Sequence, residues 1–105
     1  MIVLKSKKNA RESIVKKESI LYVFKEGRCI MFKTKDEEFY LNNTSIDAVR
    51  DKLNLYKAHS YLLVNIDNIS YFEKNFIIFN TGDKCGICEA YMYKMKRFIN
   101  NFKIS

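Results

Sequence analysis

The sequence predicts a mostly β fold: short antiparallel strands in small packed sheets, with one short internal helix and a C-terminal helix. Two observations carry this prediction. Short runs rich in β-branched and aromatic residues recur along the chain, and Gly, Asn and Asp separate them in the absence of any proline. No strand–helix–strand alternation is present, which argues against a parallel sheet. The length of 105 residues suggests one domain over 1–105.

The N-terminal half reads as a series of strands. Met1–Lys5 is expected to be an edge strand, and Ser13–Val15 a second small one. Three further strands are expected, joined by short turns at Glu26–Gly27 and Lys35–Asp36. They are Ile20–Lys25, Arg28–Thr34 and Glu37–Leu41. Strands joined in this way predict an antiparallel meander.

A short internal helix is predicted over about residues 45–53. Thr44 or Ser45 can cap its first turn, and Asp47 places a negative charge there. The apolar face of this helix is expected to consist of the residues at i, i+3 and i+7: Ile46, Val49 and Leu53.

The C-terminal part begins with two predicted strands, Ile69–Glu73 and Phe76–Phe79, and Lys84–Cys88 is expected to add another. The tail Glu89–Phe102 has helical spacing. Its apolar face is expected to be Tyr91, Met95, Phe98 and Phe102. The expected total is about seven strands and two helices.

The net charge of +7, from 19 Lys and Arg against 12 Asp and Glu, predicts an anionic partner. Nucleic acid, a membrane surface and an acidic protein all fit. The excess is concentrated at the start, where Glu12 is the only acid within residues 1–17. The apolar runs are too short for a membrane span and no signal peptide is visible, so we expect a cytoplasmic protein. Three cysteines, an odd number, suggest free thiols.

Catalytic chemistry is poorly supplied, so we expect no enzyme activity and no cofactor. His59 is the only histidine, and no nucleophile-elbow or P-loop pattern accompanies it. Without such a signature, a Cys–His pair between His59 and one of the three thiols is a remote alternative.

Cys85-Gly86-Ile87-Cys88 is a C-x-x-C motif that leaves redox and zinc chemistry open as alternatives. The redox interpretation lacks the βαβ context, and four zinc ligands would have to include Cys29 and His59. If the segment is extended, its two thiols face opposite sides of the sheet. We therefore interpret them as small hydrophobic residues and expect no metal.

The segment Leu55–Ile69 reads LYKAHSYLLVNIDNI. It resembles the LytTR DNA-binding domain of bacterial response regulators, where the corresponding segment reads approximately F-x-R-x-H-R-S-Y-x-V-N-L-x-x-I. His59, Val64-Asn65-Ile66 and Ile69 carry the match. The helix predicted before the motif and the two strands predicted at Ile20–Phe24 and 28–33 also agree with the family, so that the resemblance extends over 3–98.

The resemblance implies sequence-specific binding of double-stranded DNA for bacterial transcription regulation, with loops that enter the major groove. The first loop is Lys25–Arg28, with Arg28 as the expected base contact. The second is the segment around His59, and the third is Glu89–Tyr91. The predicted DNA-binding residues are Lys25, Arg28, Lys57, His59, Ser60, Tyr61 and Lys94.

The expected partners are double-stranded DNA, a second copy on repeated half-sites, and an upstream receiver domain or a regulatory protein. The sequence departs from the family where arginines flank the histidine, because Lys57 and Ser60 stand there. The third loop carries Glu89-Ala90 where the family commonly has arginines. These departures motivate an alternative function, a LytTR-like protein-interaction module with weak or no DNA readout.

Overall fold

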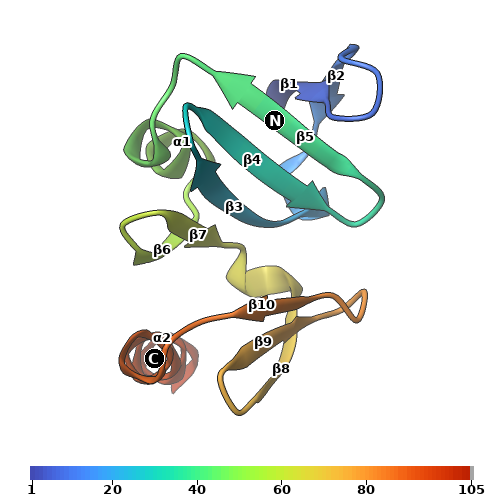
Figure 1. Ribbon diagram of the computed structural model, residues 1–105. Coiled ribbons are helices and arrows are strands. Elements are labelled where there is room, and N and C mark those ends of the chain that lie inside the picture. The colour runs from blue at the N-terminus through green and yellow to red at the C-terminus, as the bar shows by residue number, and fades with distance from the viewer. Residues whose placement is uncertain (105) are drawn as a thin grey trace. The chain divides into compact units, whose positions relative to one another are not determined.

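The computed structural model describes the backbone of residues 1–104 and the side chains of residues 1–101 (Figure 1). The chain divides into two compact units. The N-terminal unit is Met1–Asn68, and the C-terminal unit begins at Ile69.

The N-terminal unit contains a seven-stranded antiparallel sheet and the helix α1, Ile46–Leu53. The strand order is β2-β1-β5-β4-β3-β7-β6. Short 3-10 turns lie at Lys17–Ser19 and Ile66–Asn68. The strands are β1 Ile2–Ser6, β2 Glu12–Val15, β3 Ile20–Glu26, β4 Cys29–Thr34, β5 Glu38–Asn42, β6 Tyr56–His59 and β7 Leu62–Val64.

The predicted meander is confirmed, because β4 pairs with β3 on one side and β5 on the other. The expectation that Met1–Lys5 forms an edge strand is wrong. β1 lies between β2 and β5, since Lys5 pairs with Tyr40 as well as with Glu12. One apolar face and one polar face are compatible with either position, so alternation alone does not identify an edge. The edge strand on this side is β2.

The predicted helix is confirmed together with its cap. The Ser45 side chain accepts a hydrogen bond from the Ala48 N–H at 3.1 Å, which satisfies one of the amides of the first turn. Asn54 ends the helix in the left-handed region, with φ 53°. The expected apolar face of Ile46, Val49 and Leu53 is buried. It packs into the core cluster of the unit with Leu4, Val23, Phe32 and Leu63.

The hairpin formed by β6 and β7 was not predicted, so the described residues hold ten strands instead of about seven. The two strands are only four and three residues long, and a register shift interrupts their pairing between Lys57 and His59. Strands this short show little periodicity in a sequence. Ser60 and Tyr61 form the connecting turn.

Two buried asparagines connect the end of β7 to the start of β3. The Asn65 side-chain amide donates to the carbonyls of Lys17 and Ile20, each at 2.9 Å. The Asn68 amide donates to Glu18 at 2.9 Å and to Ile20 at 2.8 Å. These four bonds, which we call the asparagine clamp, satisfy the two buried side-chain amides and link the end of β7 to backbone carbonyls at the start of β3.

Asn65→Ala is expected to lower the free energy of unfolding by about 1–3 kcal/mol, because it removes two hydrogen bonds that a buried side-chain amide donates. Denaturant unfolding followed by circular dichroism measures the change. The control is Asn100→Ala, at an exposed position of the C-terminal helix, where we expect a change within about 0.5 kcal/mol. Equal effects of the two substitutions would contradict a stabilising clamp.

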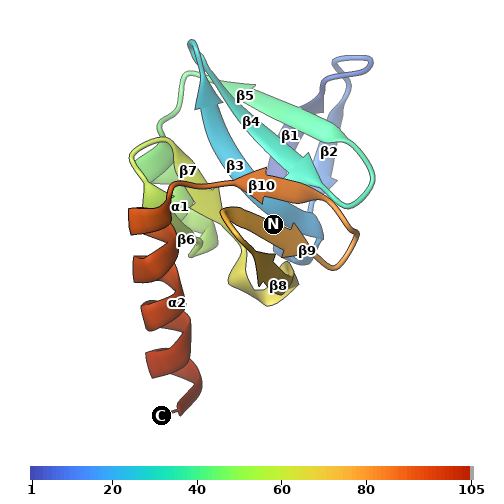
Figure 2. The ribbon, with the colours of Figure 1, turned by 60° about the horizontal axis from the view of Figure 1, so that its bottom comes forward.

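The C-terminal unit contains a three-stranded antiparallel sheet of order β10-β9-β8 and the helix α2, Glu89–Ile104, seen from the side in Figure 2. The strands are β8 Ile69–Glu73, β9 Phe76–Phe79 and β10 Lys84–Gly86. No helix in residues 1–104 is long and apolar enough to cross a membrane.

The expected apolar face of α2 is wrong in part. Met95 is fully buried, but Tyr91 is 39% exposed and Phe98 46% exposed, whereas Met92 is buried and Ile99 half-buried. Phe102 lies outside the residues whose side chains are described. The buried set 92/95/99 has the same helical spacing as the predicted one, so spacing alone could not distinguish the two faces.

Candidate nucleic-acid interface

The first two predicted loops meet at one end of the seven-stranded sheet. The Lys25 N–H donates to the Tyr61 carbonyl at 3.1 Å, so the β3–β4 turn lies beside the β6–β7 turn. The pairing of Cys29 with Asn42 brings the connection from β5 to α1 to the same end, on the left of Figure 1. We call this region, formed by residues 25–28, 42–45 and 57–61, the loop end.

Arg28 lies on a tight two-residue turn between Glu26 and Cys29, which pair with each other. Gly27 precedes it with φ 60°, a conformation that glycine adopts without strain and that type II′ hairpin turns require at this position. The arginine is exposed. A short turn anchored by two strands thus presents the guanidinium to solvent.

Lys25 and Tyr61 form a second exposed pair at the loop end. The Lys25 Nζ lies 5.8 Å from the centroid of the Tyr61 ring, within the range of a cation–π interaction, and the tyrosine is 58% exposed. This pair offers both a positive charge and an aromatic surface. Sequence reasoning named the two residues separately and did not predict their contact.

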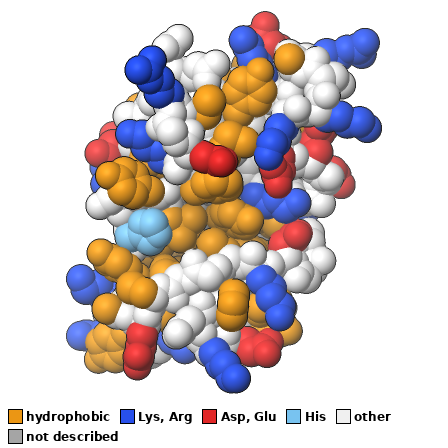
Figure 3. Space-filling model, viewed as in Figure 1, with side chains coloured by type: hydrophobic (Ala, Val, Ile, Leu, Met, Phe, Trp, Pro, Cys, Tyr) orange, Lys and Arg blue, Asp and Glu red, His pale blue; other side chains and the backbone are white. Residues whose placement is uncertain are grey.

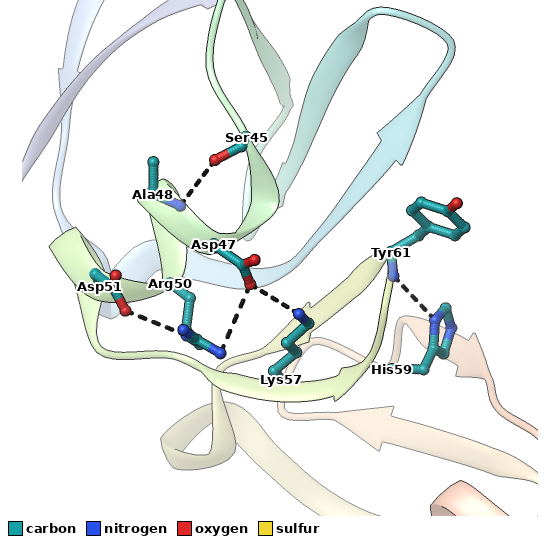
Figure 4. A network of polar contacts seen from close by, with 8 residues as sticks. All are labelled: Ser45, Asp47, Ala48, Arg50, Asp51, Lys57, His59 and Tyr61. Atoms are coloured by element: carbon teal, nitrogen blue, oxygen red, sulfur yellow. Dashed lines mark hydrogen bonds and ion pairs between the residues drawn. The ribbon is translucent and has the colours of Figure 1, made fainter.

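His59 orders the β6–β7 turn. Its Nδ1 accepts a hydrogen bond from the Tyr61 N–H at 3.2 Å (Figure 4). The neutral imidazole therefore carries its proton on Nε2, which is a donor. The ring is half-buried, and Figure 3 shows it, in pale blue, reaching the surface. Ser60, next in the chain, is exposed.

Lys57 is engaged within the protein. Its Nζ lies 2.7 Å from Asp47 Oδ1 on the first turn of α1 (Figure 4). Arg50 also approaches Asp47, at 3.6 Å, and contacts Asp51 at 3.2 Å. The hydrogen bond and the charge of Lys57, with a smaller contribution from Arg50, lower the pKa of the Asp47 carboxyl. Sequence reasoning counted Lys57 as a charge available to DNA and did not predict this partner.

Lys94 and the predicted third loop, Glu89–Tyr91, belong to the C-terminal unit. Lys94 is exposed, and its Nζ lies 5.8 Å from the centroid of the Tyr91 ring. Glu89 is the first residue of α2, where a carboxylate stabilises the helix dipole. This stabilisation is one physical reason for an acid where the family commonly has arginine.

The two thiols of the C-x-x-C motif differ in exposure, and β10 ends at Gly86, before Cys88. Cys85 on β10 is buried, and burial raises the pKa of its thiol to about 11. Cys88 is exposed. A thiol that stays protonated is a poor nucleophile, which disfavours the redox alternative. Among the described residues no group of three or more His, Cys, Asp or Glu could hold a metal ion.

The two antiparallel sheets with two helices define a LytTr-type fold. The structure is similar to that of a LytTr DNA-binding domain of a response regulator from Bacillus cereus, with a TM-score of 0.71 and 10% sequence identity. The alignment covers 93% of this chain and 94% of that chain. No curated protein gives a significant match to the sequence.

The sequence itself matches the LytTr DNA-binding domain family over residues 11–100. The chain therefore belongs to the LytTR family, which is a family of DNA-binding domains and not of enzymes. The mostly β fold expected from the sequence is confirmed.

Replacing Lys57 by Met is expected to raise the pKa of Asp47 toward the ordinary carboxyl value, because the bonded ammonium is removed. Carbon-detected NMR titration of the Asp47 carboxyl measures this shift. In the unchanged protein, the ion pair persists above the lowered pKa and is lost as the pH falls through it. Lys52→Met, which changes an exposed lysine of the same helix, should leave the titration unmoved. If Asp47 titrates identically in all three proteins, the ion pair does not form in solution.

Proposed function

We propose that this domain binds double-stranded DNA sequence-specifically for transcription regulation, and that the loop end enters the major groove. Membership of a DNA-binding family supports DNA as the partner. The observation that carries the assignment of the surface is the adjacency of the two turns, through the bond from Lys25 to Tyr61. It presents Arg28, His59 and Ser60 from one end of one sheet.

Each group at the loop end has a fitting role on DNA. The Arg28 guanidinium can donate two hydrogen bonds to O6 and N7 of guanine, the commonest specific base contact. The Ser60 hydroxyl and the His59 Nε2–H can donate hydrogen bonds to bases or phosphates. Lys25 suits a phosphate, with Tyr61 beside it. Lys57 acts by holding β6 against α1 and adds little charge of its own.

Lys94 is proposed to contact phosphate and not a base, because a single ammonium lacks the geometry for bidentate readout. Phosphate contacts of this kind release counterions and make the affinity depend steeply on salt. In this proposal the cytoplasmic domain occupies repeated half-sites as two copies, and a receiver domain or a regulatory protein controls it.

A second candidate function is a protein-interaction module with weak or no DNA readout. The observation that favours it is the charge at the loop end. Asp47 pairs with Lys57, and Glu26 lies two residues before Arg28, so these acids offset part of the positive charge there. Such a surface would attract a phosphate backbone less than one lined by free arginines.

Binding of the purified chain to random and selected duplex DNA over a range of salt separates the two functions. Duplexes are first selected from a random library and the bound sites are footprinted. A DNA-binding domain is expected to prefer the selected site and to lose affinity as salt rises. No detectable binding to either duplex at low salt would refute the DNA function and leave the interaction module.

Arg28→Ala is expected to relax the preference at one base position and to cost about 1–3 kcal/mol on the selected site. The matched control is Arg11→Ala. Arg11 is also an exposed arginine, but it lies at the opposite end of the sheet, since its neighbour Ser6 pairs with Phe39. Equal losses on selected and random duplexes for Arg28→Ala would show that this residue reads no base.

Lys94→Ala is expected to weaken binding to all sequences alike and to flatten the slope of log affinity against log salt by about one unit. Lys35→Ala, on the exposed turn between β4 and β5, removes the same charge far from the loop end and should leave the slope unchanged. A loss confined to the selected site would assign Lys94 a role in base readout instead.

A further inference from the structure

The outer edge of the N-terminal sheet is open and partly apolar. Among the described residues β2 has one neighbouring strand, β1, and its other side pairs with nothing in the sheet (Figure 2). Ile14 on β2 is 67% exposed, and Val3 lies directly opposite it on β1, 49% exposed. An open edge beside exposed apolar side chains is a template for pairing with another strand.

The backbone groups of this edge have a defined direction. The Ser6 N–H donates to the Arg11 carbonyl at 2.9 Å, which makes these two residues a hydrogen-bonded pair of the β1–β2 ladder. Bonded and non-bonded pairs alternate along an antiparallel ladder, so Leu4 with Ser13 is bonded and Val3 with Ile14 is not. The N–H and C=O of Glu12 and Ile14 therefore point away from β1.

The charges of this edge are self-complementary. If a second β2 pairs antiparallel around a two-fold axis at Ile14, then Ile14 meets Ile14 and Glu12 meets Lys16, twice. Lys16 is exposed and continues β2 in an extended conformation, with φ −84° and ψ 144°. Glu12, Ile14 and Lys16 share the outer face of the strand, because they alternate along it.

Other registers are less favourable. An axis at Glu12 opposes two carboxylates, an axis at Ser13 places Glu12 opposite Ile14, and a slip by one residue misaligns the outward backbone groups. The register at Ile14 satisfies the backbone, the apolar side chains and both charges at once.

We propose that two copies of this chain associate through their β2 edges, in antiparallel register around Ile14, and form a continuous sheet across a two-fold axis. The partner is a second copy because a two-fold axis requires a surface that complements itself. The strand is short, so the interface is smaller than that of a stable dimer and the association is weak. Two adjacent half-sites on DNA would strengthen it through effective concentration.

Sedimentation equilibrium of the full chain without DNA, in reducing buffer and from micromolar to millimolar concentration, tests the proposal. The reducing buffer removes dimers linked through the exposed Cys88. The unchanged chain is expected to show a monomer–dimer equilibrium. Ile14→Asp should abolish it, whereas Tyr71→Asp, which charges an exposed position on a strand of the other sheet, should not. Circular dichroism confirms that each variant is folded.

Charge reversal gives a second and independent arm. Lys16→Glu replaces two attractive pairs by two repulsive ones and should raise the dimer dissociation constant roughly tenfold. The double variant Glu12→Lys with Lys16→Glu should restore the dimer, and this rescue does not depend on whether Ile14→Asp folds. The proposal is overturned if the chain is a monomer at every concentration. It is also overturned if neither Ile14→Asp nor Lys16→Glu changes the dimer dissociation constant. Because DNA is absent, neither outcome bears on the proposed DNA binding.

Discussion

The asparagine clamp is the interaction on which the loop end depends. The amides of Asn65 and Asn68 donate to three carbonyls in the segment that leads into β3, and Ile20 accepts from both. This anchors the end of β7 at the start of β3 and fixes their register, with Tyr22 opposite Val64 and Phe24 opposite Leu62. A slip of one residue would turn every side chain of β7 to the other face. In the observed register the β6–β7 turn ends beside Lys25, so two buried amides determine which turns are neighbours at the far end of the strands.

The sequence allowed the fold class, the meander and the capped helix to be predicted, because each has a local signal: apolar runs bounded by turn residues, and a serine before an apolar face. The β6–β7 hairpin has no such signal. Its strands are too short to show a period, and its position depends on pairing with β3, which is distant in sequence. The face of α2 was misjudged for a related reason. Two overlapping sets of apolar residues fit the same helical spacing. Tyr91 and Tyr93 lie outside the core, where Lys94 and Arg97 approach their rings.

The loop end was foreseen only in part, and the difference lies in side-chain partners. The resemblance to the LytTR family named Arg28 and His59, and their turns do lie at one end of one sheet. It could not show that Lys57 forms an ion pair with Asp47, because the two residues lie on different elements. Nor could it show that the His59 ring accepts a hydrogen bond from the Tyr61 N–H and so orders the β6–β7 turn. Asn65 was part of the matching motif, but only the structure shows that its side chain is buried and bonded to backbone.

The positive charge of this molecule is distributed unevenly. The net charge of +7 arises largely in residues 1–17, on the β1–β2 hairpin and the segment after it, whereas the loop end carries paired and opposed charges. A diffuse positive field accelerates encounter with any polyanion and selects no sequence. Selection requires a few donors held in fixed directions. Under the proposed function, the turn of Arg28 and the turn ordered by His59 would provide them. The pairing of Lys57 with Asp47 reduces the positive charge that the loop end presents. Under the proposed function, a loop end with fewer unpaired charges would gain less from non-specific phosphate contact, and a larger share of its affinity would depend on the bases.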